Sequence, residues 1–122
     1  MKKILTVEDD IETSRYYRAL FTAAGYDVIS VGDIESARRA FHCSGPDLVI
    51  LDVGFPSGDV EEVYMMTRKI LYGGKPVIFV TGLPDKVERI RLACPNVRLF
   101  AKPVPAEALL ACVADFLGSP SA

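Results

Sequence analysis

The chain has 122 residues, half of them hydrophobic and a quarter charged, with a formal net charge of −2. This length and composition indicate one globular domain with a core of its own. The basic residues are scattered in short pairs and do not indicate a nucleic-acid-binding surface. The three cysteines, Cys43, Cys94 and Cys112, lack the spacing of a zinc site or a disulfide framework, so we interpret them as packing thiols in a reducing compartment.

Strand and helix patterns alternate along the whole chain. In the first half we expect a strand over 3–7, a helix over 11–24 capped by Asp10, a strand over 26–31, a helix with its apolar face from Ile34 to Phe41, and a strand over 48–51. In the second half we expect a helix from Val60 to Ile70, a strand over 76–80, a weaker helix over about 85–93, a strand over 97–101, and a final helix with an apolar stripe from Leu109 to Leu117.

Five strand–helix units joined by short loops require parallel strands and right-handed crossovers. We therefore predict a flavodoxin-like, doubly wound (βα)5 α/β fold, whose five-stranded parallel sheet has the order 2-1-3-4-5. The domain is expected over residues 1–118, with a loose tail over 119–122. The first apolar stretch stops at three acids and is too short for an export signal, so we expect a cytoplasmic protein.

The apolar run over 48–51 has the features of a strand buried on both faces, and it ends at Asp52. In open α/β sheets, ligands bind in the crevice beyond the carboxyl ends of the strands, where Asp52 should lie. Taken alone, an aspartate before a glycine and proline turn is more typical of turn chemistry than of catalysis. The significance of Asp52 therefore depends on its neighbours.

The predicted strand order brings four other polar residues to the same edge of the sheet. Glu8 and Asp9 follow the first strand, Thr81 follows the fourth and Lys102 follows the fifth. Clustered carboxylates repel unless a cation lies among them, and carboxylate oxygens are suitable ligands for Mg²⁺. Beside a metal ion, a carboxylate can act as the nucleophile toward a phosphoryl group, and Asp52 is the best candidate because it stands alone on the central strand.

These residues resemble the receiver domain of two-component response regulators, and the resemblance covers essentially the whole chain. The motifs that carry it are residues 4–10, 52–56, 80–82 and the Lys102-Pro103 pair. It implies Mg²⁺ held by Asp9 and Asp52 directly, by Glu8 through water and by the backbone carbonyl of Gly54. It also implies Asp52 as phosphoacceptor, Thr81 as the switch hydroxyl, Lys102 as the phosphoryl clamp, and a cis Lys102–Pro103 bond.

The resemblance implies a role in phosphorelay signal transduction. A histidine kinase or histidine phosphotransfer protein would supply the phosphoryl group, and the domain would catalyse its own phosphorylation and dephosphorylation as a regulator, without turning over a metabolite. Phosphorylation would switch a surface for a downstream protein target or for a homodimer formed through the fourth helix, fifth strand and fifth helix. Neither direct nucleic-acid binding nor a membrane is expected, unless the chain is part of a longer one.

Two positions depart from the receiver pattern. Val60 stands where receivers often have glycine. Leu99 stands where receivers usually carry the aromatic residue of the switch, and Phe100 is one place away, on the opposite face unless the strand register slips. Gly54 and Leu83 offer no polar side chain to orient a hydrolytic water, so we expect these positions not to shorten the lifetime of the aspartyl-phosphate.

Other functions stay open at this point. The chain could be a receiver-like interaction module that works without phosphorylation, which Leu99 favours. A phosphatase with Asp52 as nucleophile is a weaker alternative, because the second acid of the Asp-x-Asp pattern is replaced by Gly54. A flavin or nucleotide carrier lacks support, because no glycine-rich phosphate loop follows the first strand.

Overall fold

A five-stranded parallel sheet of order β2-β1-β3-β4-β5 organises the protein, seen in a computed structural model that describes residues 1–52, 60–82 and 96–118. The strands are β1 (Lys3–Val7), β2 (Asp27–Val31), β3 (Leu48–Asp52), β4 (Val77–Thr81) and β5 (Val97–Ala101). The helices are α1 (Ile11–Ala23), α2 (Ile34–Ser44), α3 (Val60–Tyr72) and α5 (Ala106–Leu117). The predicted fold and strand order are confirmed, whereas the helix expected over 85–93 and the tail over 119–122 lie outside the described residues.

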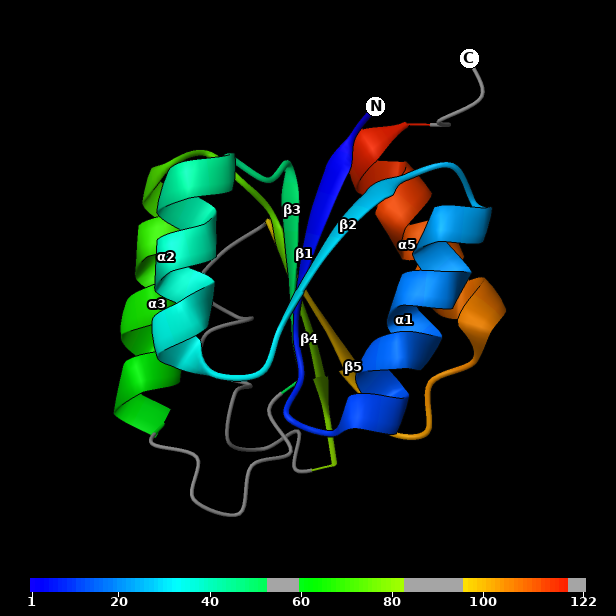
Figure 1. Cartoon of the computed structure of the whole chain (residues 1–122), viewed down its shortest axis with the longest axis horizontal. Coiled ribbons are helices and arrows are strands. Elements are labelled where there is room, and N and C mark those ends of the chain that lie inside the picture. The colour runs from blue at the N-terminus through cyan, green and yellow to red at the C-terminus, as the bar shows by residue number, and fades with distance from the viewer. Residues whose placement is uncertain (53–59, 83–95, 119–122) are drawn as a thin grey trace.

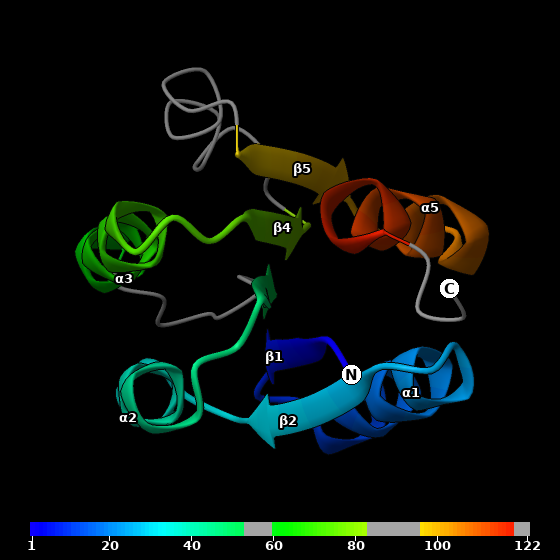
Figure 2. The same ribbon diagram turned by 90° about the horizontal axis from the view of Figure 1, so that it is seen from above.

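Helices cover both faces of the sheet. Helices α2 and α3 lie against one face, and α1 and α5 lie against the other (Figures 1 and 2). Alternate side chains of each strand point to opposite faces, so the core has two parts, with Leu51 and Phe79 packed toward α2 and α3 and Ile50 and Val80 packed toward α1 and α5. Every residue of β3 and β4 is buried, which explains why these strands appear as unbroken apolar runs.

Aspartate side chains fix the starts of the first two helices. Asp10 accepts a hydrogen bond from the backbone N–H of Thr13 at 2.9 Å, as the sequence predicts, and Asp33 accepts one from the N–H of Ser36 at 2.7 Å. Each bond satisfies a backbone donor that has no partner within its helix. Helix α1 begins shortly after β1 ends, so its N-terminus lies at the carboxyl end of β1, beside the acidic residues.

In the part of the chain that the structure describes, no helix is both long enough and apolar enough to cross a membrane.

Candidate functional site

The Asp52 side chain is the centre of the candidate site. It ends the buried central strand β3 and is only 1 % exposed. Its Oδ1 atom lies 2.7 Å from the Nζ atom of Lys102, which follows β5. A charge removed from water needs a partner of opposite charge, and Lys102 provides it.

Lys102 is positioned by the end of the neighbouring strands. Its backbone N–H donates to the carbonyl of Thr81 at 2.9 Å, and the bond that joins it to Pro103 is cis, as the family resemblance implies. Its side chain remains 37 % exposed. Burial lowers the pKa of this ammonium, but the Asp52 carboxylate outweighs the burial, so the pKa is raised and the lysine is a cation at neutral pH.

Glu8 is a second buried carboxyl group near Asp52. It is 4 % exposed, and its Oε1 atom accepts a hydrogen bond from the backbone N–H of Asp10 at 2.9 Å. Its Oε2 atom is buried and accepts no hydrogen bond from any residue that the structure describes. Burial, reinforced by the neighbouring Asp52 carboxylate, raises the pKa of Glu8 to about 8. The two carboxyl groups therefore cannot both ionise at low cost without an added cation.

This arrangement fits a hard divalent cation, although the described side chains do not form a complete metal centre. Across residues 1–52, 60–82 and 96–118, no group of three or more His, Cys, Asp or Glu side chains is arranged to hold a metal ion. The buried, unpartnered Oε2 atom of Glu8 and the Asp52 carboxylate nevertheless suit Mg²⁺, which commonly takes one or two carboxylates and completes its shell with water. Asp9 is exposed next to them, and Gly54 lies outside the described residues.

Thr81 ends β4, the strand next to Asp52, and is buried. Strand pairing aligns Asp52 with Val80, which places Thr81 one residue further along the same edge. Of the six residues predicted to form the site, the structure thus brings Glu8, Asp52, Thr81 and Lys102 to one edge, with Asp9 exposed beside Glu8.

Tyr17 contacts the phosphoacceptor candidate, which the sequence analysis does not predict. This tyrosine of α1 is buried, and its hydroxyl donates a hydrogen bond to the Oδ2 atom of Asp52 at 3.0 Å. Burial, followed by the negative charge of Asp52, raises the pKa of the Tyr17 hydroxyl, so it keeps its proton and acts as a donor. Its spacing on the apolar face of α1, together with Phe21, is that of an ordinary core residue.

The strand register decides the position of the two candidate switch residues. Leu99 pairs with Phe79 and packs with the core on the α2 and α3 face, whereas Phe100 pairs with Val80 and packs on the α1 and α5 face. No slip of the register brings Phe100 to the face of Leu99. The aliphatic Leu99 therefore occupies the position at which receivers usually have an aromatic residue.

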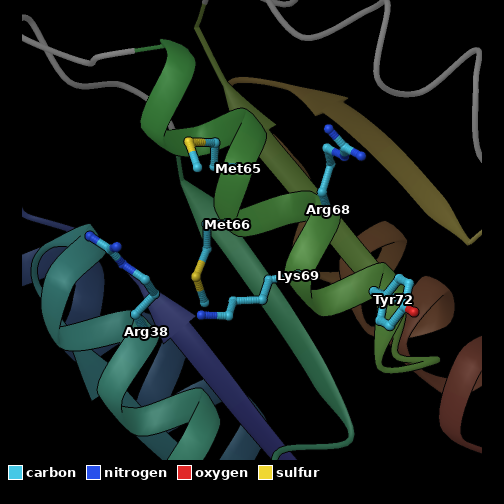
Figure 3. A pocket seen from close by; sticks show the side chains of 6 residues that line it. All are labelled: Arg38, Met65, Met66, Arg68, Lys69 and Tyr72. Carbon is cyan, nitrogen blue, oxygen red and sulfur yellow. The ribbon is translucent and has the colours of Figure 1, made fainter.

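Among the cavities lined by described residues are two on opposite faces of the sheet. One, of about 440 Å³, borders the site and is lined by Tyr16, Tyr17 and Lys102 among others. The other, of about 400 Å³, lies at α3, and the described residues that line it are Arg38, Met65, Met66, Arg68, Lys69 and Tyr72 (Figure 3). It has no acidic residue among them and is separated from Asp52 by the sheet, so it is not part of the candidate site.

Comparisons with known proteins agree with this geometry. A family model described as the response regulator receiver domain matches residues 4–114. A probable transcriptional regulator, ycf27 of Cyanophora paradoxa, is 37 % identical over 89 residues, which are 73 % of this chain and 36 % of that protein. The alkaline phosphatase synthesis transcriptional regulatory protein PhoP of Bacillus subtilis is 31 % identical over 91 residues, which are 73 % of this chain and 37 % of that protein.

A solved structure with the same fold is that of the chemotaxis protein CheY4 of Vibrio cholerae. It is 25 % identical in sequence, with a TM-score of 0.79, and the match covers 95 % of this chain and 98 % of that one. The chain thus spans little more than a third of the transcriptional regulators but nearly all of this chemotaxis protein.

Proposed function

The chain belongs to the response regulator receiver family, and we propose that it takes part in phosphorelay signalling with Asp52 as the residue that accepts the phosphoryl group. Receiver domains are the regulatory phosphoacceptors of two-component signalling. In the proposed transfer, an oxygen of Asp52 attacks the phosphorus atom of a phosphohistidine, a P–O bond forms, the P–N bond breaks, and the imidazole leaves with the electron pair.

The ion pair between Asp52 and Lys102 carries this proposal. Its 2.7 Å distance places a cation beside the carboxylate that would be modified, in a pocket that excludes most water from the carboxylate. As a phosphoryl group arrives, the same ammonium is in position to interact with the negative oxygens of that group. Thr81, at the adjacent strand end, would supply a hydroxyl to the phosphoryl group.

A divalent cation, which we take to be Mg²⁺, completes the proposed site. Asp9, Asp52 and the backbone carbonyl of Gly54 would hold it, with Glu8 acting through water. The cation would supply positive charge against the carboxylates and the phosphoryl oxygens. The buried, unpartnered Oε2 atom of Glu8 is the observation on this protein that supports such a group.

The proposed partners follow from this chemistry. A histidine kinase or histidine phosphotransfer protein would be the phosphoryl donor, and this protein would receive the phosphoryl group in the cytoplasm. The output would run through protein contacts, either with a downstream target or with a second copy of the chain at the surface of β5 and α5. Two relatives are named as transcriptional regulators, so control of transcription is a candidate output of a longer protein.

Intact-mass measurement after incubation with Mg²⁺ and acetyl phosphate tests the proposal. We expect one added phosphoryl group on the wild type and none on Asp52→Asn. An adduct that persists in Asp52→Asn would refute the assignment of the phosphoacceptor. Continued turnover of generic phosphomonoesters would instead support an aspartate-nucleophile phosphatase.

A receiver-like interaction module is the second candidate, and the position of Leu99 favours it. An aliphatic side chain in the switch position lacks the hydroxyl and the ring edge of an aromatic one. If this second candidate is correct, the wild type will form no adduct, and its partner binding will be the same with and without acetyl phosphate.

A further inference from the structure

Both oxygens of the Asp52 carboxylate have a partner, and the two partners differ in charge. The ammonium of Lys102 forms an ion pair with Oδ1, and the neutral hydroxyl of Tyr17 donates a hydrogen bond to Oδ2. Tyr17 is 3 % exposed, and its ring is held by stacking on Phe21 of the same helix, with the ring centroids 6.2 Å apart. The Tyr17 hydroxyl is thus a fixed hydrogen-bond donor to the carboxylate that would accept the phosphoryl group.

Phosphorylation of Asp52 changes the charge that Lys102 and Tyr17 face. When an Asp52 oxygen attacks the phosphorus of acetyl phosphate, a P–O bond to Asp52 forms, the P–O bond to the acetyl group breaks, and acetate leaves with the electron pair. The negative charge at Asp52 then moves from the carboxylate onto the phosphoryl oxygens, and the remaining Asp52 oxygen becomes a neutral carbonyl. A hydrogen bond to an ionised acceptor is roughly twice as strong as one to a neutral acceptor, so the Tyr17 bond weakens.

The cation of Lys102 therefore favours the phosphorylated state of Asp52, whereas the neutral donor Tyr17 favours the free carboxylate. Lys102 gains interactions when the phosphoryl oxygens arrive, because its charge attracts them. Tyr17 loses interaction strength on transfer and regains it on hydrolysis. In that step water attacks phosphorus, the P–O bond to Asp52 breaks with the electron pair returning to the carboxylate, and the proton of the water passes to the phosphate and the solvent.

We propose that Tyr17 is a residue that opposes phosphorylation of this receiver: its hydroxyl stabilises the free Asp52 carboxylate, slows acceptance of the phosphoryl group and speeds its loss. This inference rests on the proposed function, because it requires Asp52 to be the phosphoacceptor. Tyr17 acts on the leaving carboxylate and not on the attacking water.

The test compares wild type, Tyr17→Phe and Tyr26→Phe at a Mg²⁺ concentration beyond which the adduct no longer increases. Tyr26 is the matched control, because it is also a buried tyrosine, 4 % exposed, and its hydroxyl donates to the backbone carbonyl of Gly118 at 3.3 Å and not to Asp52. The phosphorylation rate is measured by intact mass with acetyl phosphate, and the decay rate is measured after acetyl phosphate is removed. Urea denaturation of each variant reports any loss of stability.

We expect Tyr17→Phe to raise the ratio of the phosphorylation rate to the decay rate roughly three- to tenfold, while Tyr26→Phe leaves this ratio unchanged. A merely structural role would lower stability and the adduct yield together, and would not lengthen the life of the adduct. A ratio for Tyr17→Phe that is unchanged or lower, with a wild-type adduct at Asp52, overturns this inference and leaves the proposed function standing. The absence of any wild-type adduct overturns both.

Discussion

Replacing Glu8 by Gln should change how the stability of the metal-free protein depends on pH. Glu8 is buried beside Asp52, and its pKa is raised to about 8, mainly by burial. The folded protein therefore binds this proton more tightly than the unfolded chain, in which the pKa is the usual 4.5. By linkage, the stability associated with the protonated Glu8 is fully present below about pH 4.5 and is lost as the pH rises through about 8.

The size of this loss follows from the two pKa values. A tenfold change in proton affinity corresponds to about 1.4 kcal/mol, so a rise from 4.5 to about 8 sets an upper bound of about 5 kcal/mol. Part of this free energy belongs to the Asp52 carboxylate, with which Glu8 shares its environment. We expect roughly 2–4 kcal/mol of stability to be lost between about pH 5 and pH 9 in the wild type, and little of that loss in Glu8→Gln.

Urea denaturation in the presence of a chelator measures the free energy of unfolding across this pH range. The profile of Glu8→Gln subtracted from that of the wild type isolates Glu8 together with its interaction with Asp52, because titrating groups that do not interact with Glu8 cancel. Glu35→Gln is the control, since Glu35 is an exposed acid in the first turn of α2. Parallel profiles for the wild type and Glu8→Gln would refute the conclusion that burial holds the proton on Glu8.

Two further substitutions test the ion pair and a helix cap. Lys102→Gln leaves the buried Asp52 carboxylate without its cation, and we expect the acetyl phosphate adduct to be lost and the free energy of unfolding to fall by about 1–2 kcal/mol, a value kept low because the lysine side chain is 37 % exposed. A wild-type adduct yield in this variant, measured by intact mass, would contradict the role given to the ammonium. Asp33→Ala removes the acceptor for the backbone N–H of Ser36, the contact that contributes most to lowering the pKa of Asp33. In thermal melts, this variant should be less stable than the wild type near neutral pH, and the difference should disappear as the pH falls below about 4, because the cap stabilises the helix only while Asp33 is ionised. Equal melting temperatures of wild type and variant at neutral pH would contradict a stabilising role for the cap.

Much of the site could be predicted from the sequence because the topology alone brings its parts together. Alternating strands and helices fix parallel strands, and the order 2-1-3-4-5 puts the ends of β1, β3, β4 and β5 along one edge. Asp52 and Lys102 are fifty residues apart in the chain, yet their predicted proximity is found as a 2.7 Å contact. The predicted alternation of faces also places Leu99 and Phe100 on opposite sides of the sheet, as observed.

Electrostatic detail could not be predicted in the same way. The sequence shows three successive acids but not which of them is buried: Glu8 is enclosed, whereas Asp9 and Asp10 are exposed. The difference arises because the chain turns into α1 directly after β1, with Asp10 capping the helix and its N–H donating to Glu8. Such a turn depends on backbone geometry that the residue pattern does not specify.

The hydrogen bond from Tyr17 to Asp52 could not be predicted from the apolar periodicity of α1. Apolar spacing identifies the inner face of α1 but not what lies opposite each residue, and a buried tyrosine generally needs a partner for its hydroxyl. Tyr26 is also buried, yet its hydroxyl donates to the carbonyl of Gly118 at 3.3 Å. The direction of the elements separates the two: α1 starts at the carboxyl edge of the sheet, so its second turn is near Asp52, whereas Tyr26 immediately precedes β2 at the opposite edge. In a parallel α/β sheet, a tyrosine in the early turns of a helix is therefore the one to examine as a partner for a carboxylate at the strand ends.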